Sequence, residues 1–267
     1  MSFWETLDPT YRAIFCDVWG VIHDGVALYP NAAKRLRQWR QEGRTVILLT
    51  NAPRSEGAVA AQLERIGLTS DCWDGIATSG EAGIAALAAL GEPVGFIGTP
   101  GDRTDLEARG VTFADAESFS DLACTGIDGV RREVGDYREE LAEACARGVR
   151  MHCLNPDLMV IRGGIAEPCA GALALAYEAL GGAVVRYGKP DPAIYDHAIR
   201  LAGSPPRDTV LAVGDALATD ILGAARYGIG AVFVTSGIHR GDDFPPEFAV
   251  TYGLGDWQPV AVVDGLA

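Results

Sequence analysis

The sequence predicts an α/β protein in which a doubly wound parallel sheet carries an inserted α/β domain. Strand-like apolar runs alternate with helix-like segments near both ends of the chain, as in parallel sheets joined by right-handed crossovers. Between these halves lies a segment with its own short α/β pattern. We therefore expect a core formed by 1–80 and 184–267, with an inserted domain at 81–183.

The first half predicts three strands and three helices. The run at 45–50 is apolar on both faces, as expected of a central parallel strand. Asn31 is a candidate N-cap for a helix that Gly43 ends, and Ser55 can open the next helix. The expected strands are 13–17, 45–50 and 75–78, and the expected helices are 32–42, 55–66 and 81–90.

The same alternation returns near the C-terminus. There we expect strands at 184–187, 209–214 and 230–235, with helices at 192–202 and 217–227. The middle segment predicts strands at 94–98, 122–127 and 149–154 and a helix at 136–147. The glycine-containing segments 78–80 and 181–182 are expected to be the hinges of the inserted domain.

Composition excludes several function classes. The formal charge of −14, without a cluster of Lys or Arg, argues against nucleic-acid binding. The apolar stretches are too short to span a membrane, and the N-terminus does not resemble a secretory signal, so we expect a cytoplasmic location. Six cysteines are scattered without metal-ligand spacing, which predicts free and mostly buried thiols.

Three carboxylates follow predicted buried strands. Asp17 ends the first strand, and Asp215 and Asp220 lie at the end of a later strand and in the first turn of its helix. Because ligands bind at the carboxyl ends of strands in open α/β sheets, we expect these carboxylates to gather there. Their mutual repulsion calls for a cation, and an all-oxygen set of this kind suits Mg²⁺.

Two further residues complete the pattern of a phosphate site. Thr50 offers a hydroxyl at the end of its strand, and Lys189 supplies a positive charge. At an effective dielectric of about 20, a unit charge pair at roughly 4 Å attracts by about 4 kcal/mol, so one lysine and Mg²⁺ can hold a phosphate beside Asp17. This predicts phosphoryl transfer through an aspartyl-phosphate intermediate.

Four short segments around these residues, in their order along the chain, resemble the four motifs of the haloacid dehalogenase (HAD) superfamily, and specifically those of its NagD-like class IIA phosphatases. The sequence FCDVWGV at 15–21 is similar to the DxDGV first motif, and LTN at 49–51 to the second. GKP at 188–190 is similar to the third, and GDALATD at 214–220 to the GDxxxTD fourth. The resemblance spans essentially the whole chain and implies a Rossmann-like core with an α/β cap at the insert.

The resemblance also implies roles for individual residues. Asp17 would be the nucleophile and a metal ligand, Asp215 a ligand, and Asp220 a ligand directly or through water. Trp19 would bind the metal only through its backbone carbonyl. Thr50, Asn51 and Lys189 would bind the transferring phosphoryl group. The sequence LNPD at 154–157 resembles a cap loop that closes over the substrate, which makes Asn155 and Asp157 candidates for substrate contact, although the same residues also favour an ordinary turn.

Trp19 departs from the family pattern. The phosphatases carry at this position a second aspartate that protonates the leaving oxygen and later deprotonates the attacking water. Losing general acid–base catalysis costs about 10²–10⁴ in rate. Asp24 and His23 are candidate substitutes, although Asp24 followed by Gly25 also fits a simple turn. We expect faster cleavage of aryl and acyl phosphates, whose leaving groups need no proton.

Two other functions compete with a phosphatase. A catalytically impaired protein could bind a phosphorylated metabolite and regulate without turnover. A 2-haloacid dehalogenase carries an aromatic residue at the position of Trp19, but its class lacks the acidic pair represented by Asp215 and Asp220. The expected partner is a small phosphorylated metabolite, and the class makes a homodimer possible.

Overall fold

Within the part of the chain that the structure describes, the large sheet has six strands, all parallel, in the order β12-β11-β10-β1-β2-β3. The computed structural model describes residues 2–114, 118–162, 164–235 and 244–267. The strands are β1 (Ala13–Cys16), β2 (Thr45–Thr50), β3 (Gly75–Thr78), β10 (Val210–Gly214), β11 (Gly230–Val234) and β12 (Ala261–Val263). The chain turns from β1 outward to β3 and later from β10 outward to β12, so the sheet is doubly wound as predicted.

Helices cover both faces of this sheet. Alternate side chains of a strand point to opposite faces, so Ile14 packs with helices α1 and α2 whereas Phe15 packs with α7 and α8. These helices are α1 (Ala32–Gln41), α2 (Glu56–Arg65), α7 (Pro192–Leu201) and α8 (Leu222–Tyr227). Short elements complete this part: η1 (Phe3–Thr6), η2 (Ser70–Cys72), η4 (Arg207–Thr209), the π-helical turn η5 (Leu217–Ile221) and α9 (Phe248–Thr251).

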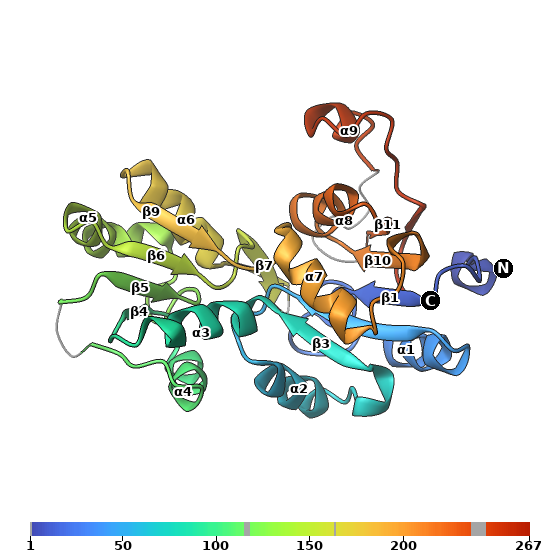
Figure 1. Ribbon diagram of the computed structural model, residues 1–267, viewed down its shortest axis with the longest axis horizontal. Helices are drawn as coiled ribbons and strands as arrows, with labels where there is room; N and C mark the ends of the chain where they lie inside the picture. Colours follow the sequence, from blue (N-terminus) through green and yellow to red (C-terminus); the bar gives the residue numbers. More distant parts are fainter. Residues whose placement is uncertain (1, 115–117, 163, 236–243) are drawn as a thin grey trace.

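A second parallel sheet, in the order β4-β5-β6-β9, forms the cap (Figure 1). A separate antiparallel hairpin joins β7 to β8, and β7 lies between the two sheets in Figure 1. The cap strands are β4 (Gly95–Ile97), β5 (Asp121–Cys124), β6 (Arg150–Cys153), β7 (Met159–Arg162), β8 (Ile165–Pro168) and β9 (Ala183–Arg186). Its helices are α3 (Ser79–Leu90), α4 (Pro100–Ala108), η3 (Val134–Tyr137), α5 (Arg138–Ala146) and α6 (Ala170–Ala179).

The strand expected at 184–187 belongs to the cap, not to the core. As β9 it pairs with β6, with Met151 opposite Val184, and forms the edge of the cap sheet. The expected boundary at 184 therefore places this strand on the wrong side, and the chain returns to the core only after β9. Gly181 and Gly182 precede β9 and are not the crossing point. A short apolar run has the same pattern in either sheet, so periodicity cannot say which sheet it joins.

Other local differences follow from backbone geometry. Asn31 has a left-handed φ of 64° and makes no side-chain cap hydrogen bond, whereas Ser55 accepts one from the amide of Ala58. The segment expected as one helix at 217–227 begins as the π-helical turn η5 before α8.

The six cysteines are free thiols, as expected, and five of them are buried. Among the described residues, no helix is long and apolar enough to cross a membrane.

Candidate active site

The predicted site residues converge at the carboxyl ends of three adjacent strands. Asp17 directly follows β1, Thr50 ends β2, and Asp215 directly follows β10. Because β1 lies between β10 and β2 in the parallel sheet, the three residues emerge side by side at one edge. Asp220 lies in η5, and Lys189 lies in the loop after β9. All five side chains are buried.

Lys189 is held by three hydrogen bonds and has only 2% of its surface exposed. Its Nζ donates to Oδ1 of Asp17 at 2.5 Å and to Oδ1 of Asp220 at 2.7 Å. The third bond goes to the carbonyl oxygen of Leu49 at 2.9 Å, on the neighbouring strand β2. An ammonium group has three donors, so this geometry uses all of them and fixes the nitrogen between two carboxylates.

The electrostatics of the pair follow from burial and from the neighbouring charges. Burial raises the pKa of Asp17, and the carboxylates of Asp220 and Asp215 raise it further, against the opposite effect of Lys189. Burial disfavours the charged ammonium of Lys189, but Asp17 and Asp220 outweigh this effect and keep its pKa well above the usual value. The positive charge of Lys189 thus balances only part of the negative charge of the three carboxylates.

The chemistry of the cluster fits a divalent cation. Among the described residues, Asp17, Asp215 and Asp220 each offer a carboxylate oxygen, and these oxygens lie within 4.8 Å of one another. Three carboxylates with one ammonium leave two negative charges in a buried site. Such an all-oxygen set is the kind that holds Mg²⁺. A hard divalent cation would balance that charge, so the residues present fit the metal.

Gly20 places the backbone beside this cluster. It has a φ of +85°, and a Cβ built there would overlap the carboxylate of Asp215. Only glycine adopts this conformation without strain and also leaves room for the carboxylate. The backbone around Trp19 and Gly20 therefore runs against Asp215, which is where a carbonyl ligand from Trp19 would be required.

Asn51 connects the lysine segment to the cap. Its Oδ1 accepts from the amide of Lys189 at 2.7 Å, and its Nδ2 donates to the carbonyl of Lys189 at 3.1 Å. The same Nδ2 donates to Oδ1 of Asp157, in the cap loop, at 2.8 Å. Burial raises the pKa of Asp157, and Lys189 opposes this. Asn155 accepts from the amide of Asp157 at 3.1 Å and so shapes this loop.

A cavity of about 1030 Å³ lies between core and cap beside the site. Thr50 lines it, and its hydroxyl accepts from the amide of Ala52 at 3.2 Å. Asn155 and Asp157 line it from the cap side. Arg54, another lining residue, binds Asp102 of α4 across the two domains at 2.6 Å. The cavity therefore provides space for a leaving group between the phosphate-binding residues and the cap.

The two candidate acid–base substitutes have different surroundings. His23 is buried and lines the cavity, its Nδ1 accepts from the amide of Gly25 at 2.8 Å, and burial lowers its pKa to about 4. Asp24 accepts from the amides of Val26 and Ala27 at 2.9 and 2.8 Å, and these bonds lower its pKa. Its carboxylate is thus used to form a turn, and Asp24 is not among the described residues that line the cavity.

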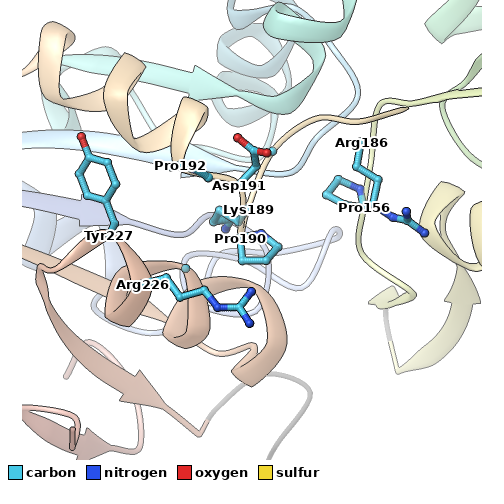
Figure 2. Close-up of a pocket in the computed structure, with 10 residues that line it drawn as sticks. Pro156, Arg186, Lys189, Pro190, Asp191, Pro192, Arg226 and Tyr227 are labelled. Carbon is cyan, nitrogen blue, oxygen red and sulfur yellow. The ribbon is translucent and has the colours of Figure 1, made fainter. Parts of the chain in front are cut away.

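A smaller cavity of about 420 Å³ adjoins the segment 188–192 (Figure 2). Figure 2 shows Arg226 of α8 and Arg186 of β9 on either side of Pro190. Arg186 forms a bidentate pair with Glu178 at 2.5 and 2.7 Å. None of the three clustered carboxylates is among its described lining residues, although Lys189, which bonds to two of them, is.

The contacts that cross between core and cap were not predicted from the sequence. Besides Arg54 with Asp102, the side chain of Trp19 reaches strand β7 and donates from Nε1 to the carbonyl of Ile161 at 2.9 Å. The sequence does indicate the hairpin, because two apolar runs flank the glycines at 163 and 164. No sequence pattern indicates the contact of the hairpin with Trp19, because the partner of the indole is a backbone carbonyl.

Comparison with known proteins gives one consistent family. A model described as haloacid dehalogenase-like hydrolase matches residues 14–112, and a second, described as HAD-hydrolase-like, matches residues 186–266. The ribonucleotide monophosphatase NagD of Escherichia coli is 30% identical over 239 residues, covering 88% of this chain and 91% of NagD. The 5'-nucleotidase YutF of Bacillus subtilis is 26% identical, covering 94% of this chain and 98% of YutF.

The solved structures agree with the sequence comparison. A haloacid dehalogenase-like hydrolase from Brucella suis matches with a TM-score of 0.88 and 32% identity, covering 98% of both chains. A glycerol phosphate phosphatase from Mycobacterium tuberculosis, solved in complex with calcium, matches with a TM-score of 0.65 and 25% identity, covering 85% of this chain and 67% of that one.

Proposed function

This chain belongs to the haloacid dehalogenase superfamily, in its NagD-like class IIA, and we propose that it is a Mg²⁺-dependent phosphatase of a small phosphorylated metabolite. The observation that carries the proposal is the buried cluster in which Lys189 bridges Asp17 and Asp220 while Asp215 lies alongside. A turn or helix cap does not require three buried carboxylates around one lysine. A carboxylate nucleophile that attacks an anionic phosphate needs cations beside it, and here Lys189 supplies one while the three carboxylates can hold another.

Asp17 is the proposed nucleophile. One of its oxygens attacks phosphorus, the bond from phosphorus to the leaving oxygen breaks, and the leaving group departs with that electron pair. Lys189 holds Asp17 in place and offsets the repulsion between carboxylate and phosphate. Thr50, through its hydroxyl, and Asn51, through its backbone amide, are the proposed contacts of the transferring phosphoryl group, because the Asn51 side chain already bonds to Lys189 and Asp157.

Asp17, Asp215 and Asp220, with the Trp19 carbonyl, would hold Mg²⁺, which when bound supplies positive charge for the phosphoryl oxygens. Water then attacks phosphorus in the acyl phosphate, the bond from phosphorus to the Asp17 oxygen breaks, and inorganic phosphate leaves. The attacking water must give up a proton in this step. His23 lines the cavity, but its Nδ1 already accepts from the amide of Gly25 and its pKa is lowered to about 4, so it is a poor acceptor for that proton.

The relatives and the size of the cavity limit the kind of leaving group that the site can take. The relatives are named for nucleotide and glycerol phosphate substrates. The cavity of about 1030 Å³ matches the upper range of small-molecule sites, about 300–1000 Å³. We infer a phosphomonoester whose leaving group is of metabolite size.

A metabolite-binding protein without turnover is the second candidate, because Trp19 takes the place of the usual proton donor. It would keep the metal and phosphate sites and release no phosphate. Dehalogenation is disfavoured by the three-carboxylate cluster, which that reaction does not need.

Phosphate release from a panel of aryl, acyl and alkyl monoesters tests the proposal. With Mg²⁺ the wild-type protein should release phosphate, and Asp17→Asn or chelation of the metal should abolish this release. Phosphate binding without release would favour the metabolite-binding candidate. Chloride release from a 2-chloro acid without metal would favour the dehalogenase.

A further inference from the structure

Trp19 connects the core to the cap hairpin. It follows β1 by only a few residues, yet its Nε1 donates to the carbonyl of Ile161 in β7 at 2.9 Å. A buried or half-buried indole N–H usually finds a partner, and here that partner belongs to the other domain. The side chain therefore points toward the cap.

The hairpin also places a cation on the indole ring. The guanidinium carbon of Arg162, in β7, lies 4.9 Å from the centroid of Trp19. Arg162 is itself oriented by Glu167 of the paired strand β8, with Nε and Oε2 2.9 Å apart. The ring thus meets the hairpin at two adjacent positions, one through a hydrogen bond and the other through a cation–π contact.

The core holds the other side of the ring. Gly25 has a φ of +87°, and a Cβ there would lie 2.5 Å from the Trp19 ring atoms, so this close approach requires glycine. The His23 ring meets Trp19 edge-on at a centroid distance of 5.0 Å. The indole is therefore confined between the segment 23–25 of the core and the cap hairpin.

These contacts lie in the wall of the large cavity. Trp19 and Arg162 line it, together with the hairpin residues Met159, Val160 and Ile165. Leu158, Met159 and Ile165 are apolar and more than half exposed. A leaving group that extends from the phosphate site toward the cap would meet these exposed apolar side chains, the indole ring of Trp19 and the Arg162 guanidinium that lies over it.

We propose that Trp19 is a specificity-determining residue that fixes the β7–β8 hairpin against the core, so that the site selects phosphomonoesters with a large, apolar or aromatic leaving group. The inference rests on the proposed function. It assigns to the Trp19 side chain a positioning role in place of the proton transfer that an aspartate performs there. Small leaving groups that do not reach the hairpin gain nothing from this contact.

Trp19→Phe tests the inference because it keeps an aromatic ring and removes the N–H donor. Two measurements apply: amide hydrogen exchange of peptides in 158–168, and the dissociation constant of 1-naphthyl phosphate with Mg²⁺. Binding is measured in an Asp17→Asn background, so that it does not depend on turnover. Arg162→Met tests the same contact from the cap side. Trp257→Phe is the matched control, because Trp257 is half-buried but packs against Phe248 in the core.

We expect Trp19→Phe to speed exchange of the hairpin amides and to weaken naphthyl phosphate binding about three- to tenfold, the loss typical of one neutral hydrogen bond. Inorganic phosphate binding should change less than about twofold, since phosphate does not reach the hairpin. Arg162→Met should also speed exchange of the hairpin amides and weaken naphthyl phosphate binding. Trp257→Phe should change neither the exchange nor the binding. Unchanged hairpin exchange, or equal weakening for phosphate and naphthyl phosphate, would overturn the inference. Absence of phosphate release in the wild-type protein would instead contradict the proposed function.

Discussion

Nζ of Lys189 lies 2.5 Å from Oδ1 of Asp17, and both side chains are buried at the carboxyl end of the large sheet. The lysine reaches this position from a loop that follows the last cap strand, whereas the aspartate follows the first core strand. The pair therefore forms only when the chain has returned from the cap to the core. It combines a nucleophile with the cation that offsets its repulsion from phosphate.

Lys189→Gln removes this cation and should lower kcat/KM on an aryl phosphate by about 10²–10³-fold, the usual cost of losing one preorganised donor at a reacting group. The chain contains one other lysine, the exposed Lys34 in α1, so Lys34→Gln is a matched control. Steady-state kinetics at saturating Mg²⁺ measure the effect. Comparable activity in the two variants would show that Lys189 is not part of the site.

Asp215→Asn should weaken Mg²⁺ binding and stabilise the metal-free protein. It removes one of three clustered negative charges, so repulsion falls in the absence of metal. The half-saturating Mg²⁺ concentration should rise by at least about 10–100-fold, the range for lost groups that support a metal. Thermal unfolding with and without Mg²⁺, with Asp208→Asn as a surface control, measures both effects. A metal-free variant less stable than wild type would contradict the repulsion argument.

His23 should make stability depend on pH. Its pKa is about 4 in the folded protein and about 6.5 when unfolded, so the unfolded chain binds more protons between these values. The free energy of unfolding should therefore fall as the pH falls from 6.5 to 4, by roughly 3 kcal/mol from this group. Urea unfolding of wild type and His23→Asn across this range isolates the contribution. Parallel curves for the two proteins would show that His23 is not the cause.

Asp157 should act on turnover more than on substrate binding. It bonds to Asn51, whose amide group holds the backbone of Lys189 on both sides. Asp157→Leu should lower kcat about 10–100-fold, the equivalent of one charge-assisted hydrogen bond, with a smaller change in KM. Asp157→Asn keeps an acceptor oxygen and should recover most of the activity. A large rise in KM at unchanged kcat would instead identify Asp157 as a direct substrate contact.

The leaving group should determine the rate. The described site offers no obvious proton donor, because Trp19 faces the hairpin and Asp24 is held in a turn. Aryl and acyl phosphates should therefore be cleaved about 10²–10⁴-fold more efficiently than alkyl phosphates, the range attributed to general acid–base catalysis. The dependence of log kcat/KM on leaving-group pKa measures this. Equal efficiency for phenyl and alkyl monoesters would mean that another group supplies the proton.

The sequence predicted the core well because its signals are local. The strand at 45–50 and the strand at 75–78 match β2 and β3 residue for residue, since continuous apolar runs bounded by turn residues have few other interpretations. Asp17, Asp215 and Asp220 could be placed together because parallel strands align their carboxyl ends. Their closeness follows from topology, which the alternation of strands and helices already indicates.

What depends on distant contacts could not be predicted. The assignment of β9 to the cap sheet depends on its pairing with β6, and nothing in four residues specifies a partner. The orientation of Trp19 depends on the carbonyl of Ile161, 142 positions away, and every residue other than proline carries the same backbone groups. Asp24 had two interpretations in the sequence, a substitute acid and a simple turn, and its bonds to the amides of Val26 and Ala27 favour the turn.

Detection of a phosphorylated aspartate tests most directly whether Asp17 attacks phosphorus. An aryl phosphate is turned over with Mg²⁺, the reaction is quenched in acid, and the peptide that contains Asp17 is analysed by mass spectrometry before and after hydroxylamine treatment. If Asp17 is the nucleophile, it will carry a phosphoryl group that hydroxylamine removes and that is missing in Asp17→Asn and without Mg²⁺. Phosphate release by Asp17→Asn at the wild-type rate would contradict this role of Asp17.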